Sequence, residues 1–433
     1  MKGADSERTE AGFKVRTPVD EARRILREAI EGQQSDDEPC ATGTETVDVE
    51  RADGRTLAAP LESARNVPHY RRAAMDGYAV RAEDTFGASD RSPEVLGIAE
   101  GIGADATVEP ETAARVHTGS ALPEGADAVV MIEEVEELES TGVPELEVGD
   151  AVAEGENVAP IGEDVAEGQH LYEAGHRLRP SDLGLIRSAG YDRVAVAEQP
   201  TVGVIPTGEE LVEGDPGPGE VVETNGLTVS RLAERWGARA TYRDVVTDDP
   251  ESLRVAIQRD LTKDVVVTTG GSSVGERDLL PEVIDDLGEV LVHGVGLKPG
   301  HPVCLGIVED TPVLALPGYP VACIVNAVQF LRPTLRWLEG TDPDPHPTTP
   351  AVLERKIPSE PGTRTFARVQ LEERDPDEIG DGEPRFAATP TRASGSGVLS
   401  SVALADGWVV VDDDREGIPA GETVSVEDWE VNP

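Results

Sequence analysis

The sequence predicts a multidomain protein of the α/β plus β class. It indicates an elongated stem, an inserted all-β domain, a three-layer α/β domain with a mainly parallel sheet, and a C-terminal β-barrel-like domain. Three observations indicate this. At 433 residues the chain is too long for one ordinary core, so about two to four domains are expected. Strand and helix patterns alternate between residues 200 and 338, which is typical of a parallel sheet covered by helices. Short alternating strands rich in glycine occupy residues 60–150 and the last ninety residues.

The predicted elements follow from these patterns in chain order. A helix is expected from Thr17, with proline in its first turn and an apolar face of Ala22, Ile25, Leu26 and Ile30. The α/β region should contain strands at 202–205, 240–246, 265–267, 290–297 and 312–316, and helices at 224–236, 250–261, 279–287 and 321–338. The C-terminal region should contain strands at 366–371, 386–389, 408–411 and 424–426.

Changes of pattern give the domain boundaries. An all-β segment lies between two similar pieces, which suggests insertion into a stem, and the proline-rich stretch at 340–350 is typical of a linker. The predicted domains are the stem at 15–59 and 150–187, the inserted β-rich domain at 60–149, the α/β domain at 188–340, and the C-terminal domain at 345–433.

The charge of the chain is its most unusual property. It has 85 acidic and 38 basic residues, which give a net charge of −47, and the acidic residues occur in every segment. Nucleic acid and anionic membrane surfaces are therefore excluded as partners, because a chain this negative is repelled by phosphate groups. The chain has 5 lysines and 33 arginines. This composition predicts a halophilic protein from a high-salt cytoplasm, where salt screens the self-repulsion.

Cysteines and the N-terminus point to a reducing, cytoplasmic setting. Cys40, Cys304 and Cys323 are odd in number and form no C-x-x-C pair, so neither a disulfide framework nor a zinc site is expected. The first residues have no apolar signal-peptide core, and no stretch reaches the length of a membrane span.

The stretch from Asp264 to Pro302 contains the most informative local pattern. An apolar strand ends in Thr268-Thr269-Gly270-Gly271, and helical spacing follows at 279–287. Small residues between a strand and a helix let backbone N–H groups approach an anion at the helix N-terminus. The spacing matches neither the dinucleotide fingerprint nor the P-loop, so a plain tight turn is an equal alternative.

Other residues that could carry chemistry stand at predicted strand ends. Asp278 follows the glycine turn, where a carboxylate could hold a metal that bridges phosphates. Lys298 precedes Pro299-Gly300, and lysine is so rare here that its compact charge favours a binding role over an incidental exposed lysine. Ligands of open α/β sheets lie beyond the carboxyl ends of the strands, where Glu210, Asp248 and 317–320 also fall.

Seven motifs occur in order between residues 75 and 322. They are MDGYAV, TGSALPEGADAVV, GEDVAEGQ, PTGEEL, TTGGSSVGERD, KPG and LPGYPVA. Together they resemble the molybdopterin molybdenumtransferase family, which includes the C-terminal domain of gephyrin. The resemblance implies that adenylylated molybdopterin and molybdate, or tungstate, are converted with Mg²⁺ into molybdenum cofactor and AMP. Such a substrate needs an anion cradle, a metal near the phosphate anhydride and a cationic slot for the oxyanion.

The resemblance also implies roles for individual residues. Asp76, Asp278 and Lys298 would be catalytic, and Glu210, Asp278, Asp248 and Asp164 would hold the metal. Lys298, Arg368 and Ser396 would bind molybdate. The pterin substrate would contact Thr118, Thr269, Gly270, Gly271, Ser272, Ser273, Pro317 and Pro320. Because Arg368 and Ser396 come from the C-terminal domain, the resemblance implies a site completed across a homodimer. For each carboxylate the alternative is a solvated surface residue, which the acidic composition favours.

The sequence departs from the family at three positions. His301 replaces a common second lysine, Tyr319 replaces an asparagine, and Ala159 replaces an arginine. Two rival functions also exist. A molybdopterin adenylyltransferase shares the α/β domain but lacks the stem and the C-terminal domain, and an enzyme of that class would be the partner that supplies the substrate. A non-catalytic molybdopterin-binding scaffold would keep the fold without the carboxylates and Lys298.

Overall fold

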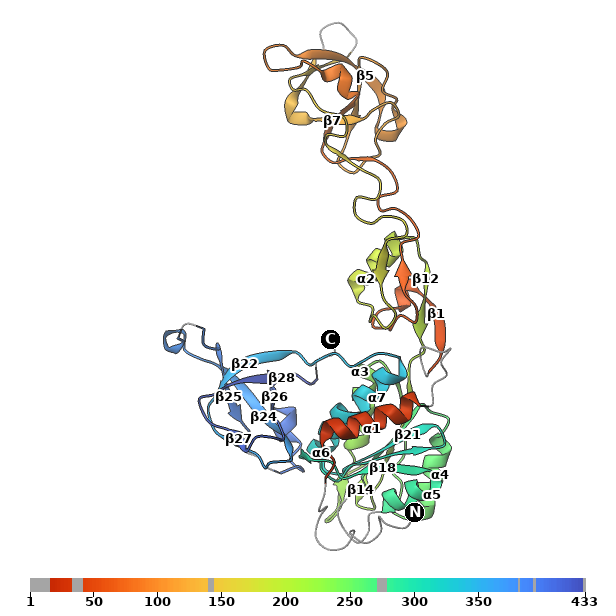
Figure 1. Cartoon of the computed structure of the whole chain (residues 1–433), viewed down its shortest axis with the longest axis vertical. Helices are drawn as coiled ribbons and strands as arrows, with labels where there is room; N and C mark the ends of the chain where they lie inside the picture. The colour runs from red at the N-terminus through yellow and green to blue at the C-terminus, as the bar shows by residue number, and fades with distance from the viewer. Residues whose placement is uncertain are drawn as a thin grey trace. The chain divides into compact units, whose positions relative to one another are not determined.

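The computed structural model describes residues 16–32, 42–138, 144–270, 279–380, 382–391 and 395–430 (Figure 1). The chain divides into two compact units. We call Thr46–Ala195 the central unit, and Met1–Glu45 with Val196–Pro433 the outer unit. Within the described part of the chain, no helix is both long and apolar enough to cross a membrane.

The outer unit contains a six-stranded sheet in the order β16-β13-β17-β21-β20-β18. The first four strands are parallel, and β20 is antiparallel to both of its neighbours, so the other five share one direction. The mainly parallel sheet is therefore confirmed. β20 was not predicted from the sequence. This strand is antiparallel to β21, and a short turn suffices to join two antiparallel strands. The bounds are β16 Arg239–Tyr242, β13 Thr201–Pro206, β17 Val265–Thr269, β21 Thr311–Leu316, β20 Cys304–Val308 and β18 Glu289–His293.

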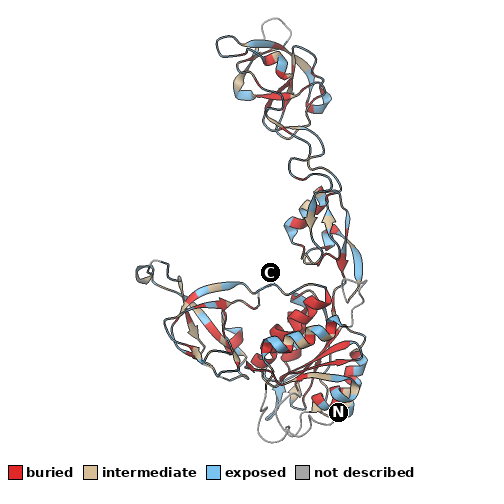
Figure 2. Cartoon of the chain, in the orientation of Figure 1, coloured by how far each residue is buried: buried red, intermediate tan, exposed pale blue. Residues whose placement is uncertain are grey.

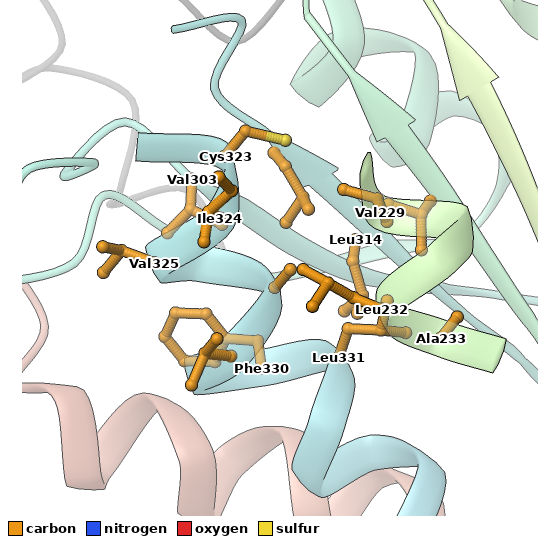
Figure 3. Close-up of a cluster of buried hydrophobic side chains, with 14 of the residues drawn as sticks. Val229, Leu232, Ala233, Val303, Leu314, Cys323, Ile324, Val325, Phe330 and Leu331 are labelled. Atoms are coloured by element: carbon orange, nitrogen blue, oxygen red, sulfur yellow. The ribbon is translucent and has the colours of Figure 1, made fainter. Parts of the chain in front are cut away.

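Helices cover both faces of this sheet. Along β17, Val265 and Val267 join one hydrophobic core and Val266 joins the other, because successive strand residues point to opposite faces. Figure 3 shows part of the first core and labels Leu232, Phe330 and Leu331 among its residues. The helices on that face are α1 Val19–Glu31, α3 Asn225–Arg235, α6 Pro320–Asn326, the π-helical turn η5 Ala327–Leu331 and α7 Arg332–Leu338; those on the other are α4 Pro250–Asp260 and α5 Leu279–Leu287.

Helix α1 belongs to the outer unit. Its apolar face consists of Val19, Ala22, Leu26 and Ile30, which are at most 2% exposed and join the same core as α7. The sequence-based assignment of residues 15–59 to the stem stays a prediction. The apolar stripe was predictable from spacing, but the surface that covers it lies about three hundred residues further along the chain.

The C-terminal part forms a closed five-stranded barrel in the order β24-β25-β22-β28-β26, because β26 pairs with both β28 and β24. Its predicted strands are confirmed, and β22 completes the ring. The short strand β19, Leu297–Lys298, pairs with β24 and so joins the barrel to the α/β part. The bounds are β22 Thr348–Leu353, β23 Ile357–Pro358, β24 Arg364–Glu373, β25 Phe386–Pro390, α8 Ser400–Ala403, β26 Gly407–Val411, β27 Gly417–Ile418 and β28 Thr423–Glu427.

The central unit contains a six-stranded sheet in the order β7-β4-β6-β5-β9-β8, within the range predicted to be all-β. Tyr78, Val80 and Leu146 are at most 2% exposed and contribute to its core, and Figure 2 shows such buried segments in red. The bounds are β4 Gly77–Val80, β5 Glu94–Ile102, β6 Thr112–Val116, β7 Ala128–Met131, β8 Val135–Leu138 and β9 Glu145–Val148.

Helix α2, Pro180–Ser188, is held by one buried carboxylate in the central unit. Asp182 accepts hydrogen bonds from the backbone N–H of Arg179 at 2.9 Å and from the Tyr172 hydroxyl at 3.2 Å, and His176 Nε2 lies 2.9 Å away. Short paired strands accompany it: β1 Thr44–Asp48 with β12 Arg193–Ala197, β2 Leu61–Glu62 with β11 His170–Tyr172, and β3 Arg72–Ala73 with β10 Val158–Ala159.

The remaining elements are short. In the outer unit β14, Leu211–Val212, pairs with β15, Val221–Val222. Single 3₁₀ turns occur at η1 Val49–Arg51, η2 Ala82–Thr85, η3 Gly103–Asp105, η4 Ile132–Glu134 and η6 Pro376–Glu378. The division into four domains with the predicted boundaries stays a prediction.

Candidate functional site

Three loops meet where β13, β17 and β21 end. The N–H of Gly270 donates to the carbonyl of Leu316 at 3.0 Å. A Cβ at Gly270, whose φ is +143°, would lie 2.1 Å from the carbonyl oxygen of Thr207, and a Cβ at Gly318 would lie 3.5 Å from the Cα of Gly270. The predicted residues Thr269, Gly270 and Pro317 are therefore brought to one edge of the sheet. Gly271, Ser272, Ser273 and Asp278 lie outside the described residues.

Buried hydroxyl groups collect at the same edge. The Oγ1 atoms of Thr207, Thr268 and Thr269 are buried and have no hydrogen-bond partner among the described residues. A buried hydroxyl without a partner costs about 1–3 kcal/mol, so such groups need an explanation such as a ligand. Sequence reasoning identified Thr269 but missed Thr207. The available signal was its position in the PTGEEL motif, at the end of a predicted strand.

An acidic pair lies beside Thr207. The N–H of Gly208 donates to the carbonyl of Val246 at 3.1 Å, which brings the loop after β13 alongside the segment that contains Asp248. Burial raises the pKa of Asp248, and the nearby charges of Glu210 and Glu209 raise it further. Asp248 Oδ1 is buried without a hydrogen-bond partner among the described residues. A cation would relieve this arrangement, because it offsets both the repulsion and the burial cost.

The predicted metal set is only partly assembled in the described chain. Glu210 and Asp248 are close enough for their charges to interact. Asp164 is exposed and belongs to the central unit. The described residues contain no group of three or more His, Cys, Asp or Glu side chains arranged to hold a metal ion. The remaining predicted ligand, Asp278, lies outside them.

The loop after β21 carries the LPGYP motif and leads into α6. Asn225 Nδ2, at the start of α3, donates to the carbonyl of Gly318 at 2.7 Å, and Pro320 begins α6. The carbonyl of Ser396 accepts from the N–H of Val321 at 3.0 Å. Ser396 therefore reaches this loop within one chain, and its position beside Pro320 does not itself require a second copy.

The Lys298-Pro299-Gly300 turn is anchored on α6. Asn326 Nδ2 donates to the carbonyl of Gly300 at 2.9 Å, and a Cβ at Gly300 would lie 2.2 Å from that nitrogen. The Lys298 side chain is 57% exposed, and its Nζ lies 3.5 Å from Glu360 Oε1. An exposed pair of this kind is worth little, so Lys298 can bind an anion instead.

Two other basic residues lie near this turn: His301 follows it directly in the sequence, and Arg368 lies on the strand that pairs with Lys298. Lys298 pairs with Thr365 of β24, and Arg368 follows three residues later on that strand, or about 10 Å along it. Arg368 is buried, and this burial lowers its pKa. Burial and then the charge of Arg16 lower the pKa of His301 below its usual range, which favours the neutral imidazole. His301 therefore does not replace the charge of the family's second lysine.

In the central unit, Asp76 and Thr118 are in direct contact. The backbone N–H of Thr118 donates to Asp76 Oδ1 at 2.6 Å and its hydroxyl donates to the same oxygen at 3.0 Å. The first bond and then the second lower the pKa of Asp76. Gly77 is required next to it, because a Cβ there would lie 2.0 Å from the carbonyl oxygen of Val130. Asp76 of the MDGYAV motif and Thr118 of the TGSALPEGADAVV motif are 42 residues apart in the sequence, and they are in contact in the fold.

Family models match three successive parts of the chain. Residues 17–190 match the MoeA N-terminal region (domain I and II), residues 203–337 match a probable molybdopterin binding domain, and residues 350–429 match the MoeA C-terminal region (domain IV).

Full-length relatives agree with these matches. A putative molybdopterin biosynthesis protein of Methanocaldococcus jannaschii is 34% identical over 88% of this chain and 91% of its own length. The molybdopterin molybdenumtransferase of Bacillus subtilis is 33% identical over 94% of this chain and 93% of its own length. The crystal structure of a molybdopterin biosynthesis MoeA protein from Pyrococcus horikosii superposes with a TM-score of 0.78 at 33% identity, covering 96% of this chain and 99% of that one.

Proposed function

Because the chain belongs to the MoeA family of molybdopterin molybdenumtransferases, we propose that it inserts molybdate into adenylylated molybdopterin and releases AMP. The observation that carries this proposal is the convergence of Thr207, Gly270 and Gly318 at one sheet edge, beside the acidic pair Glu210 and Asp248. A phosphate anhydride could bind where strand ends, unpaired hydroxyls and a potential cation site meet.

The acidic pair fits a magnesium ion. Asp248 is partly buried, has an oxygen without a partner among the described residues, and has a pKa raised by burial and neighbouring carboxylates. We propose that Glu210, Asp248 and Asp278 hold Mg²⁺, which supplies charge neutralisation at the phosphates when bound. Thr207 and Thr269 would orient phosphate oxygens by donating hydrogen bonds.

The oxyanion needs a positive site. Lys298 supplies an exposed ammonium on a turn that Asn326 fixes, and Arg368 supplies a buried guanidinium on the neighbouring strand. We propose that these two cations and Ser396 bind molybdate. Asp76, whose lowered pKa keeps it ionised at neutral pH, is proposed as the catalytic carboxylate that Thr118 orients.

The rival functions are less well supported. Relatives that carry the transferase name align with almost the whole chain, including the parts outside the α/β domain, which an adenylyltransferase lacks. The carboxylates and Lys298 that a pure scaffold would not need are present. We further propose a homodimer in the cytoplasm of a high-salt cell, supplied by a separate adenylyltransferase. Light scattering in molar KCl tests the dimer.

The decisive assay is AMP release from adenylylated molybdopterin with Mg²⁺, in molar KCl, with molybdate or tungstate. Oxyanion-dependent release by the wild-type protein is expected, and the comparison identifies the preferred metal. Lys298→Ala should lower the rate by about 10²-fold, as removal of one charged donor typically does. Lys356→Ala removes an exposed lysine of the same unit and should leave the rate unchanged. No release from folded protein with either oxyanion would disprove the transferase proposal.

Asp278→Asn provides a separate check on the metal site. The variant should fold normally and lose AMP release, because one proposed carboxylate ligand is gone. Full activity in both Asp278→Asn and Lys298→Ala would contradict the assigned residues even if the wild-type protein were active.

A further inference from the structure

A cavity lies in the outer unit, and the strand-end residues of the candidate site do not line it. Its volume is about 650 Å³, and it is lined by α1, the middle of η5, the start of α7, residues between 343 and 348, and the barrel. This volume is in the range of small-molecule sites. None of the described residues proposed above to bind substrate or metal lines it. The cavity therefore needs its own explanation.

Two arginines in this cavity lack carboxylate partners. Arg23 donates to the carbonyl and to Oε1 of Gln329 at 2.9 and 2.6 Å, and Arg332 donates to the carbonyl of Asp344 at 2.6 Å. Neither forms an ion pair within the described part of the chain. Arg332 is 7% exposed, and burial lowers the pKa of both arginines. The charges of Asp20 and Glu427 raise the pKa of Arg23, but burial outweighs them. Burying two such cations without a direct ion pair is costly, and unexpected in a chain with 85 acidic residues.

His346 adds a donor to the same cavity. Its Nε2 lies 3.5 Å from Arg332 Nη1. Because a guanidinium can only donate, Nε2 must accept, and the proton then resides on Nδ1. Burial first, and then the charges of Arg332 and Arg23, lower the pKa of His346 to about 4, so the ring stays neutral. The Nδ1 atom is buried without a partner among the described residues.

Arg364 supplies another unsatisfied donor. Its Nη1 and Nη2 donate to the two carboxylate oxygens of Asp20, each at 2.8 Å. Its Nε is buried with no hydrogen-bond partner among the described residues, and lies 3.9 Å from Asp412 Oδ1. The unsatisfied groups of His346 and Arg364 are thus both N–H donors, which an acceptor-rich ligand would match.

Four acidic side chains also line the cavity, and two of them, Glu422 and Glu427, have hydrogen-bond partners among the described residues. Glu422 accepts from Arg415 at 2.8 Å, and Glu427 accepts from Trp408 Nε1 at 2.9 Å. The charges of Asp344 and Glu427 raise the pKa of Arg332, but burial outweighs them. An apolar part of the lining completes the cavity; it consists of Phe366, Val409, Val410, Ile418 and Val424.

We propose that this cavity binds a small dianion with a tetrahedral oxyanion head, such as a phosphate ester, held by Arg23 and Arg332. Two guanidinium groups without carboxylate partners balance a doubly charged head, and their planar forks bind phosphate oxygens in pairs. The apolar lining accommodates an organic body. The inference does not depend on the transferase reaction, because none of the described residues assigned to that reaction contributes to the cavity.

Isothermal titration calorimetry at constant ionic strength tests the proposal with phenyl phosphate, inorganic phosphate and benzoate. Wild-type protein should bind at least one phosphate probe, and Arg23→Gln should weaken that binding by at least about tenfold, as loss of a charge-assisted contact does. Arg24→Gln is the matched control, because Arg24 lies on the same helix, is 52% exposed and pairs with Glu21 and Glu28. Its affinity should stay within about twofold of wild type.

Comparison of the three probes distinguishes the possible ligands. Binding of phenyl phosphate alone identifies an organic ester, whereas equal binding of inorganic phosphate identifies the free ion. Tighter binding of benzoate, equal affinities of Arg23→Gln and Arg24→Gln, or no binding by the wild-type protein would each overturn the proposal.

A second measurement covers the case in which Arg23→Gln does not fold. Crystals of the wild-type protein soaked in selenate should show an anomalous peak at hydrogen-bond distance from both Arg23 and Arg332. Crystals without such a peak would overturn the proposal independently of any variant.

Discussion

Gly270→Ala should separate the strand ends that build the candidate site. The φ of +143° is one that side-chain-bearing residues rarely adopt, and it costs about 1–3 kcal/mol. In addition, the new Cβ would lie 2.1 Å from the carbonyl oxygen of Thr207, where ordinary contact begins at 3.4 Å. That oxygen belongs to the backbone, so a side-chain rotation cannot relieve the clash. Relief requires β17 and β13 to move apart by roughly 1 Å, which adds about 1–3 kcal/mol of overpacking.

The assay is hydrogen exchange with mass spectrometry on peptides that cover β13 and β17. The overpacking of about 1–3 kcal/mol should by itself increase local opening of these strands by about 5- to 150-fold. Gly219→Ala is a matched control, because Gly219 has a φ of +93° and nothing within 4 Å of its Cβ position. It should leave exchange in β13 and β17 unchanged. If Gly270→Ala exchanged no faster than Gly219→Ala in these strands, the close approach of Thr207 and Gly270 would be refuted.

Three further perturbations give separate tests. Burial would raise the pKa of Asp182, but hydrogen bonds from Arg179 and His176 outweigh it and hold the pKa well below its usual range. This carboxylate therefore stabilises the fold above about pH 4 and loses that contribution as the pH falls, so the thermal midpoint should drop less on acidification in Asp182→Asn than in wild type. Burial raises the pKa of the Cys323 thiol, so iodoacetamide at about pH 8 should label it only in unfolded protein, as mass spectrometry would show. Asp248→Asn should weaken Mg²⁺ binding by at least about tenfold in calorimetry, and unchanged affinity would exclude Asp248 as a ligand.

Much of the outer unit could be predicted from sequence because its signals are local. A run such as Val265–Val267 is buried on both faces, and only a central strand between helices accommodates it. The partner of α1 could not be predicted in this way. Its spacing shows that one face is buried, but spacing carries no information about which distant surface covers that face.

In the candidate site, too, the sequence identified individual residues but not the contacts between them. Asp76 and Thr118 were identified from separate motifs, and their contact arises because Gly77 pairs with Val116 in the antiparallel sheet. Such a register depends on the packing of whole strands, so sequence alone does not give it. The cavity at Arg23 and Arg332 was missed for a different reason. An arginine in a sequence is interpreted as a surface residue, and only the fold shows that Arg332 is buried and Arg23 partly buried.

The packing of α1 against α7 has a consequence for synthesis of the protein. Ribosomes add about 5–20 residues per second, so the apolar face of α1 waits for roughly 15–60 seconds before α7 has been made. During this time the whole central unit is translated and can fold as an independent body. Nascent chains stalled before residue 320 should therefore remain open to protease at α1 while the central unit already resists digestion. The fold thus imposes an order of events in which the first helix made is among the last to be buried.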